Sequence, residues 1–493
     1  MQNLQIVDEA NALFLGKFKK FSSLFLSLSC LLGFLLIFIL TGCGGGNKDN
    51  NNLASVVYTI NFYDDNLDLS QSIVVPSKEV NLAQLITDYG LPTPLYEGNS
   101  SVDISTYTNY SITGSTNLYA TQGIQEIRTE TELAAINTDF VTLSGKYVLL
   151  NDIVLDTTLD ETKGWLPIGN ETNEFTGIFN GNNHIISNLW IDAYSYIGYI
   201  GLFGHIRDAQ IKNIGVEIDD LNGGVKGYGF VGGVAGAINN SSIISSYSIG
   251  KVGEEEDIYG SALVGGVAGY VSNGSSVINS YSIGDVRGDD QVGGVVGMAE
   301  YDSNIINSYS VGNVYGDNQF IGGVVGYTRY NTNITNSYSI GDVRGGGFSH
   351  FVGGVVGIAQ HDSSVINSYS IGNINGYYFV GGIAGSGDHY ERIQYNVAIN
   401  PSVNGNYEYE VVNRVVGLND VGTASDNFAL EDMLVNGNTV SDDTDNGEGK
   451  SEAELKTKST YQSLGWGFGD DNANPWKIDA NKNNGFPYFY WQE

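Results

Sequence analysis

Two short motifs recur together through the middle of this chain, and their spacing restricts the folds open to it. The first motif is Val/Ile-Gly-Gly-Val/Ile-Ala/Val-Gly, with its leading glycine at Gly232, Gly265, Gly293, Gly322, Gly353 and Gly381. The second is Ser-Tyr-Ser-Ile/Val-Gly, with its tyrosine at Tyr247, Tyr281, Tyr309, Tyr338 and Tyr369. Successive glycines are 33, 28, 29, 31 and 28 residues apart, and successive tyrosines are 34, 28, 29 and 31 apart. Because the two spacings vary together, insertions fall in equivalent loops of one structural repeat.

A repeat of this length holds only a few short strands, so it must stack on its neighbours to bury an apolar face. Around each tyrosine the residues alternate between two sets, which is typical of a β-strand. In one repeat the first set is Val277, Asn279, Tyr281 and Ile283, and the second is Ile278, Ser280, Ser282 and Gly284. We therefore predict a strand that points the two sets in opposite directions. Stacked in register at about 4.8 Å per turn, such repeats form a parallel β-helix, and the fold class is all-β.

The composition supports this architecture over the other repeat folds. The chain holds 66 glycines and only 7 prolines, which suits many short strands joined by tight turns. A β-propeller is disfavoured because its blades need about 40 residues or more.

The stretch from Leu133 to about Gly385 resembles proteins with GLUG motifs, which are named for a Gly-Leu-any-Gly word and occur on bacterial surface proteins and adhesins. The segments that carry the resemblance are 147–153, 165–169, 175–181, the Gly-Leu-Phe-Gly word at 201–204 and the later Gly-Gly-Val series. The resemblance implies a β-solenoid, which we place at residues 129–420, on a cell-surface or adhesin-like protein.

The amino end has the order of an export signal. Three lysines at positions 17, 19 and 20 precede an apolar run over 21–40 and the word Leu40-Thr41-Gly42-Cys43. This resembles a lipoprotein signal peptide, which implies removal of residues 1–42 and attachment of lipid to Cys43. The alternative is a plain membrane-spanning anchor, because about 20 apolar residues cross a bilayer. Residues 43–53 are predicted to be a flexible tether, and the expected location is the bacterial cell envelope, at the outer membrane or cell surface.

Two smaller parts flank the predicted solenoid. Residues 54–122 resemble the internalin-type B repeat, a β-grasp-like module, in their opening strand and in the closing Thr-x-Leu-Tyr-Ala signature, although the usual Gly-Trp before the last strand is missing. Residues 421–493 are predicted to be a loop and a carboxyl-terminal cap rich in aromatic residues. We expect this cap to close the end of the solenoid, because an open end would template further strands.

The sequence holds no recognised catalytic or metal-binding motif. The five histidines are scattered, and no pair has metal-ligand spacing. No Gly-x-Ser-x-Gly word is present, and Cys43 is the one cysteine outside the signal peptide. We predict no catalytic residue, metal or cofactor, and a protein that is not an enzyme. The net charge of −33 argues against nucleic acid as a partner.

An enzyme of the same fold is nevertheless the main alternative, because some β-helix proteins cleave polysaccharides with clustered carboxylates. Asp285 with Arg287, and Asp342 with Arg344, occupy equivalent places two repeats apart. We interpret them as solvated pairs in turns. The acidic loop 442–445 is interpreted in the same way, with calcium binding as the alternative.

Four aromatic residues in loops of variable length are the candidate ligand-binding residues: Tyr315, Phe348, Tyr377 and Tyr378. Exposed together, they would stack on sugars or on a protein partner, and the alternative is internal stacking between turns. The predicted function is a lipid-anchored surface scaffold for adhesion or ligand binding, with a membrane contact through Cys43 and a glycan or surface protein as ligand. The alternatives are the polysaccharide-cleaving enzyme and a purely structural envelope protein.

Overall fold

The structure is a computed structural model that describes residues 57–492, except 113, 157–159, 161, 254–262, 348, 389–391, 408–409 and 420–423. The predicted signal peptide, Cys43, the tether and Phe348 lie outside the described residues. Within the described part of the chain, none of the helices has the length and hydropathy needed to span a bilayer.

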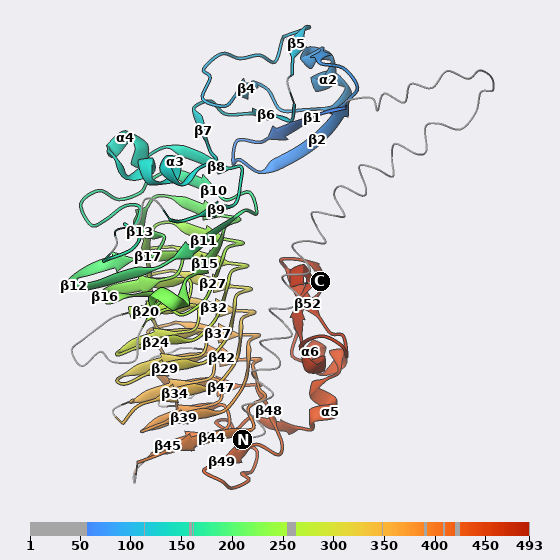
Figure 1. Ribbon diagram of the computed structural model, residues 1–493. Helices are drawn as coiled ribbons and strands as arrows, with labels where there is room; N and C mark the ends of the chain where they lie inside the picture. Colours follow the sequence, from blue (N-terminus) through green and yellow to red (C-terminus); the bar gives the residue numbers. More distant parts are fainter. Residues whose placement is uncertain are drawn as a thin grey trace, which may run out of the picture. The chain divides into compact units, whose positions relative to one another are not determined.

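Short parallel strands stacked in register form a β-solenoid (Figure 1), and we call each of its turns a rung. One rung consists of β22 (Ser276–Ile278), β23 (Tyr281–Ile283), β24 (Val286–Gly288), β25 (Gln291–Gly293) and β26 (Val296–Glu300). The next consists of β27 (Asn304–Ile306), β28 (Tyr309–Val311), β29 (Val314–Gly316), β30 (Phe320–Gly322) and β31 (Val325–Arg329). Corresponding strands build two sheets of 11 strands, two of 8 and one of 6. The predicted parallel β-helix is therefore confirmed.

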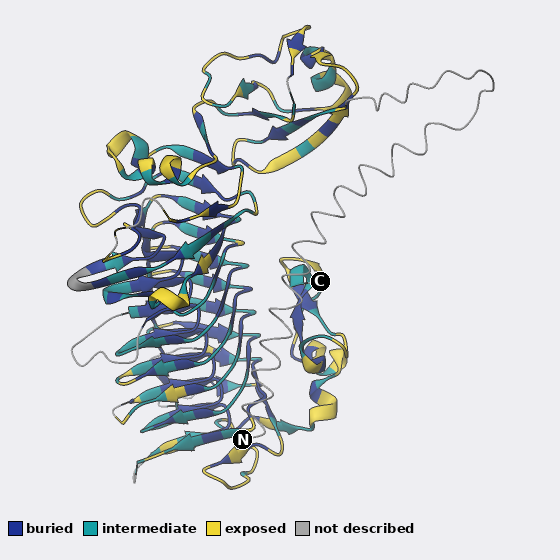
Figure 2. Ribbon diagram, in the orientation of Figure 1, coloured by how far each residue is buried: buried dark blue, intermediate teal, exposed yellow. Residues whose placement is uncertain are grey.

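The register of these sheets places identical residues of the two motifs on one another. Tyr281 pairs with Tyr309, and Gly293 pairs with Gly322. Inside, valine and isoleucine side chains from successive rungs form one continuous core, which Figure 2 shows as buried strand segments. The motif spacing thus has a direct cause, because each repeat must return the chain to the same place one strand spacing further on.

The prediction that Val277 and Tyr281 share one strand and one side is wrong. Val277 lies in the solenoid core on β22, whereas Tyr281 lies on β23 in a different sheet and packs in a separate cluster. Between them Asn279 has a φ of 51°, a left-handed conformation that turns the chain through a corner. Asparagine tolerates this conformation, and successive corners are linked by Asn307 Nδ2, which donates to Asn279 Oδ1 at 3.1 Å.

The second glycine of each Gly-Gly word is needed for close packing between rungs. A Cβ added to Gly323 would lie 2.1 Å from the carbonyl oxygen of Gly354 and 2.4 Å from Ser339 Oγ. Ser339 is buried, and its hydroxyl donates to that same Gly354 carbonyl at 2.5 Å. Glycine and inward serine therefore form one packed unit that repeats along the solenoid.

The amino-terminal module is a four-stranded sheet with one helix. Its elements are β1 (Tyr58–Tyr63), β2 (Leu69–Val75), α2 (Leu82–Tyr89), β4 (Tyr96–Glu97) and β6 (Thr116–Tyr119). The strand order is β2-β1-β6-β4, with β1 and β6 parallel and the outer pairs antiparallel, which is β-grasp-like. Lys212 of the solenoid, which is 5% exposed in its side chain, pairs with Asp68 of the module at 2.7 Å.

Rung pairing continues beyond the expected boundary at residue 420, to β50 (Glu448–Lys450), which pairs with β48 (Phe428–Leu430). The acidic loop 442–447 closes the solenoid at this end. Arg414 stands where earlier rungs have the second glycine, is 1% exposed, and donates to Asp442 Oδ1 at 2.6 Å and to the Gly447 carbonyl at 2.9 Å. The bond from Arg414 lowers the pKa of the Asp442 carboxyl.

The aromatic carboxyl-terminal segment covers the side of the solenoid and not its end, which corrects the predicted place of the cap. We call residues 451–492 the strap. Its elements are α5 (Glu452–Leu455), α6 (Lys458–Ser463), β51 (Phe468–Asp471), β52 (Asn474–Lys477) and β53 (Tyr488–Phe489). The strap packs on a column of stacked rings, the tyrosine ladder, formed by Tyr247, Tyr281, Tyr309, Tyr338 and Tyr369 with centroids 4.7–4.9 Å apart. The strap aromatics thus bury a ladder that would otherwise face solvent.

Replacing Gly323 with alanine tests the packing role of the glycine motif. We expect the variant to lose about 1–3 kcal/mol of stability, because the new methyl group overpacks against backbone. Gly347→Ala is the control, since a Cβ there meets nothing within 4 Å. Urea unfolding followed by circular dichroism measures both variants, and equal midpoints for them would contradict the packing role.

Candidate functional site

One lateral sheet carries an outward row of flat polar side chains, which we call the planar ladder. Its strands are β24, β29, β34 (Val343–Gly345), β39 (Ile374–Gly376) and β44 (Ser402–Gly405). Their central outward residues pair in register and are Arg287, Tyr315, Arg344, Asn375 and Asn404. The flanking residues Val286, Val314, Val343 and Ile374 are buried in the core. The sheet thus presents one planar polar group per rung.

The groups of the planar ladder lie against one another. The guanidinium carbon of Arg287 lies 4.2 Å from the ring centroid of Tyr315. The guanidinium carbon of Arg344, on the next rung, lies 5.8 Å from the same centroid. Asn404 Nδ2 donates to Asn375 Oδ1 at 3.2 Å. Partial burial raises the pKa of the Tyr315 hydroxyl, which keeps it neutral. Tyr315 was predicted to lie in a loop, and this prediction is wrong because Tyr315 lies within β29.

A hollow of about 230 Å³ opens beside the first three strands of the planar ladder, β24, β29 and β34. Its lining consists of Arg287, Gly288, Tyr315, Gly316, Asp317, Arg344, Gly345 and Gly346. Half of these residues are glycines, so little side-chain bulk fills the hollow. The lining of the hollow thus combines guanidinium and phenol groups with glycine backbone.

Asp285 and Asp342, beside this hollow, form hydrogen bonds to the next rung of the solenoid. Asp285 Oδ1 accepts from the backbone N–H of Asn313 at 3.0 Å, and Asp342 Oδ1 accepts from that of Asn373 at 2.9 Å. Each carboxylate also pairs with its own arginine, at 3.6 Å for Arg287 and 2.7 Å for Arg344. The interpretation of these pairs as turn residues is wrong for the arginines, because Arg287 lies within β24 and Arg344 within β34, whereas the two aspartates lie just before these strands. The aspartates also join one rung to the next. No group of three or more metal-ligating side chains occurs among the described residues.

A cluster of unstacked aromatic rings lies in the loops that follow the planar-ladder strands. Tyr377 and Tyr378 meet Tyr407 at centroid distances of 5.0 and 4.4 Å, and His350 meets Tyr378 at 5.0 Å. The rings are inclined by 42–83°, so their faces point in several directions. We call these four residues the loop cluster. The structure thus groups Tyr377 and Tyr378 together but separates them from Tyr315.

Sequence reasoning missed His350 and Tyr407. A signal existed, because both lie in the variable loop one rung away from the loop of Tyr377 and Tyr378.

A second lateral surface carries apolar and aromatic side chains and was also missed. We call it the aromatic strip; its members are Tyr199, Phe230, Leu263, Phe320, Phe351 and Phe379, with Tyr270, Met298, Tyr327 and Ile358 beside them. Most of these side chains are partly exposed. The sequence signal was a large residue directly before the Val/Ile-Gly-Gly motif, which is aromatic or leucine in five of the six copies.

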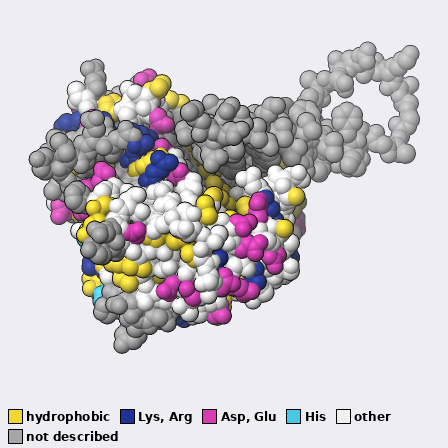
Figure 3. Space-filling model, turned by 90° about the horizontal axis from the view of Figure 1, so that it is seen from below, with side chains coloured by type: hydrophobic (Ala, Val, Ile, Leu, Met, Phe, Trp, Pro, Cys, Tyr) yellow, Lys and Arg dark blue, Asp and Glu magenta, His cyan; other side chains and the backbone are white. Residues whose placement is uncertain are grey.

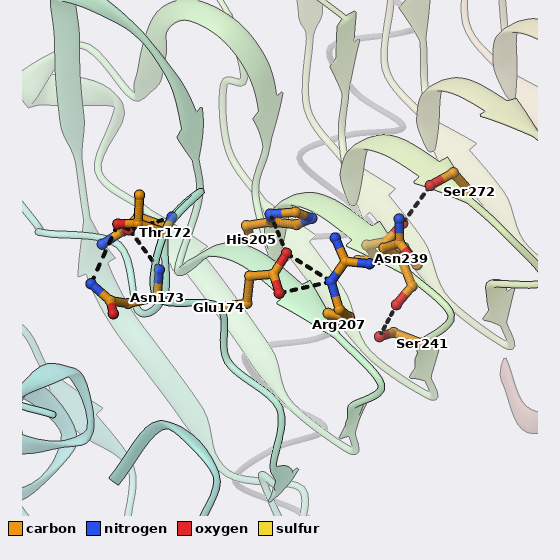
Figure 4. A network of polar contacts seen from close by, with 10 residues as sticks. Thr172, Asn173, Glu174, His205, Arg207, Asn239, Ser241 and Ser272 are labelled. Atoms are coloured by element: carbon orange, nitrogen blue, oxygen red, sulfur yellow. Dashed lines mark hydrogen bonds and ion pairs between the residues drawn. The ribbon is translucent and has the colours of Figure 1, made fainter. Parts of the chain in front are cut away.

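A polar network lies at the amino-terminal end of the aromatic strip (Figure 4). Arg207 Nε donates to the two oxygens of Glu174 at 2.8 and 2.7 Å, and His205 Nδ1 lies 3.3 Å from Glu174 Oε1. The Tyr199 ring stacks on His205 at 4.6 Å. Burial lowers the pKa of His205, while the Glu174 carboxylate acts in the opposite direction.

Comparisons with known proteins show similarity over parts of this chain. No protein-family model matches it. It is 30% identical to Halomucin from Haloquadratum walsbyi over 175 residues, which are 29% of this chain and 2% of that protein. It is 35% identical over 106 residues, 21% of this chain and 12% of the other, to a protein of Evansella cellulosilytica named provisionally as a Gly-rich membrane protein. The chain thus spans a small part of the length of these curated relatives.

Two solved structures are similar to this chain. One was assigned provisionally as an immunoglobulin A1 protease from Bacteroides ovatus, with 18% identity, a TM-score of 0.38, and coverage of 75% of this chain and 93% of that one. The other is titled IgA1 Protease, with 15% identity, a TM-score of 0.34, and coverage of 62% and 21%.

The lowered pKa of His205 makes an acid-sensitive contribution to stability. Because the folded state holds this imidazole neutral, its contribution is present above the unfolded pKa of about 6.5 and declines as the pH falls below that value. His205→Phe keeps a ring against Tyr199 and removes the titration. We expect the thermal midpoint of the native protein to fall more steeply than that of the variant between pH 7 and pH 5, as measured by calorimetry. Parallel profiles would contradict the assignment.

Proposed function

We propose that this protein is a cell-surface β-solenoid that binds an extended, uncharged glycan along the planar ladder. The observation that carries the proposal is the in-register row Arg287, Tyr315, Arg344, Asn375 and Asn404, with one planar polar group per rung beside a glycine-lined hollow. A polymer lying along the solenoid axis would meet one such group about every 4.8 Å. This spacing lets successive sugar units each form hydrogen bonds.

The chemistry of the row matches sugar hydroxyl groups. Guanidinium and amide groups supply donors, and the amide and phenol oxygens supply acceptors. The loop cluster adds inclined tyrosine rings whose faces can pack against the apolar face of a pyranose. The planar ladder would thus bind the hydroxyl groups of the glycan, and the rings of the loop cluster would pack against its apolar faces.

The charges near the ladder favour an uncharged ligand. Each arginine already has an aspartate partner, so the row has no surplus of positive charge. The whole chain carries a net charge of −33, which repels polyanions. Figure 3, seen from below, shows acidic side chains mainly at the right and along the lower edge of the view, with Lys and Arg side chains among them.

The proposal includes the location inferred from sequence. The lysine-led apolar run and Cys43 support a lipid anchor in the cell envelope, and one partly similar protein is named as a membrane protein. The enzyme alternative would require carboxylates free to act on a substrate, and those of Asp285 and Asp342 accept hydrogen bonds from neighbouring rungs.

Glycan binding is tested with the Tyr315→Ala and Tyr378→Ala variants on an array of neutral oligosaccharides. We expect each to weaken binding at least tenfold, because each removes a ring from the proposed surface. Tyr301→Ala is the matched control, since Tyr301 is 43% exposed at the turn after β26 and lies outside both the ladder and the loop cluster. Unchanged binding in the first two variants would refute the site, and shortening of the bound glycan would establish the enzyme alternative.

Lipid attachment is tested separately by replacing Cys43 with serine in the full-length chain. We expect the native protein to gain the mass of a lipid on residue 43 and to fractionate with membranes. The variant should lack this modification. An uncleaved amino end in mass spectrometry would instead show a membrane-spanning anchor.

A further inference from the structure

The aromatic strip carries chemistry that the proposed glycan site does not use. Its members alternate along each strand with core residues: Phe320 and Phe351 face outward, whereas Ile321 and Val352 between the outward positions lie in the core. Their rings stack along the solenoid, with centroids 5.5 Å apart for Phe320 and Phe351 and 5.0 Å apart for Phe351 and Phe379. Tyr327 stacks on Phe320 at 4.7 Å. The strip is therefore an ordered outward surface two side chains wide.

The same chain shows how such a stack of rings is covered by polypeptide. On the tyrosine ladder, strap residues contact the stacked rings at an inclination: Trp476 lies 6.1 Å from Tyr338 at 44° and 5.8 Å from Tyr369 at 52°. Phe489 contacts Tyr309 and Tyr338 in the same manner. With this cover, Tyr309, Tyr338 and Tyr369 are at most 1% exposed.

The strap binds through side chains and not by strand addition. Its strands β51, β52 and β53 form a sheet of their own, in which no described strand of the solenoid takes part. The strap follows the ladder from rung to rung, with Trp491 against Tyr281 and Trp466 against Tyr369. The structure therefore contains one example of a stacked row of rings that is covered by an aromatic-rich segment lying along the solenoid axis.

The aromatic strip differs from the tyrosine ladder in remaining partly exposed. Charges beside it are paired, since Arg329 contacts Glu300 and Arg207 contacts Glu174. A strip without surplus positive charge does not match an anionic membrane or nucleic acid. Stacking also occupies the ring faces that a sugar would need, and leaves the ring edges outward.

The dimensions favour a narrow partner. From Tyr199 to Phe379 the strip spans about 29 Å at the usual strand spacing, which an extended segment of about nine residues would cover. At two side chains wide it offers about 300 Å² per partner, well below the roughly 800 Å² per partner of a standard interface. A second copy packed strip to strip would bury too little surface for a stable dimer.

We infer that the aromatic strip is a docking surface for an extended polypeptide segment of a partner protein, rich in aromatic side chains as the strap is. The segment lies along the solenoid axis, and its rings pack at an inclination against the edges of Phe320, Phe351 and Phe379. This inference is independent of the proposed glycan site.

The probe for this surface is a labelled synthetic peptide with the sequence of residues 464–492, added to the intact protein. The strap of the intact protein is tethered next to the tyrosine ladder and therefore outcompetes added peptide for that site. Binding of the added peptide thus measures binding to the aromatic strip. Fluorescence anisotropy should show binding that falls at least tenfold in the double variant Phe320→Ser, Phe351→Ser. The double variant Tyr301→Ser, Tyr330→Ser, which removes a stacked and exposed ring pair outside the strip, is the matched control and should bind within twofold of the native protein.

A gain-of-binding variant keeps the test independent of any folding defect. Gln291 interrupts the outward row between Leu263 and Phe320, so Gln291→Phe should strengthen peptide binding at least threefold. Circular dichroism checks that every variant is folded. The inference would be overturned if the peptide did not bind, or if the Phe320→Ser, Phe351→Ser variant bound it as well as the native protein. It would also be overturned if the native protein formed a dimer, bound vesicles or bound a glycan and this variant no longer did so.

Discussion

Parallel main-chain pairing between equivalent residues of successive rungs is the interaction on which the rest of this structure depends. It brings identical side chains to the strand spacing, so valines stack on valines inside and tyrosines on tyrosines outside. The pairing is possible because the Gly-Gly word lets neighbouring backbones approach to distances that a Cβ would prevent. Each outward position therefore becomes a row of like groups, and a lateral surface takes its chemistry from one position of the repeat.

Three lateral surfaces illustrate this rule with different outcomes. The tyrosine ladder is covered by the strap and serves the fold. The planar ladder carries arginine, tyrosine and asparagine beside a glycine-lined hollow, and its partial exposure suits a polar ligand. The aromatic strip is apolar and bordered by paired charges, and its partial exposure suits a polypeptide cover. Repetition thus produces extended surfaces in place of a single enclosed pocket.

The two arginine–aspartate pairs show how far local sequence reasoning reached. Both partners of each pair were predicted to lie in turns, but Arg287 and Arg344 belong to strands β24 and β34, and only the two aspartates lie in the turns before them. Their hydrogen bonds to the backbone N–H of the next rung were not foreseen, because the acceptor and donor lie 28 to 31 residues apart in sequence. The same distance hid the contacts of Tyr407 with Tyr377 and Tyr378, although all three lie in loops of variable length. Local patterns identify which residues face outward, and the stacking of rungs decides which of them meet.

By itself the sequence determined the parallel β-helix, because two motifs with a shared period leave stacking as the way to bury their apolar residues. The β-grasp-like module was expected only from the resemblance of residues 54–122 to the internalin-type B repeat, in the opening strand and the closing Thr-x-Leu-Tyr-Ala signature. Only the tertiary structure decided that each tyrosine motif turns a corner at a left-handed asparagine, and that the aromatic carboxyl-terminal segment covers the side of the solenoid while Arg414 and the loop 442–447 close its end. The reason is physical: periodicity reports which side chains avoid water, whereas the surface that shields them is chosen by contacts between parts of the chain far apart in sequence.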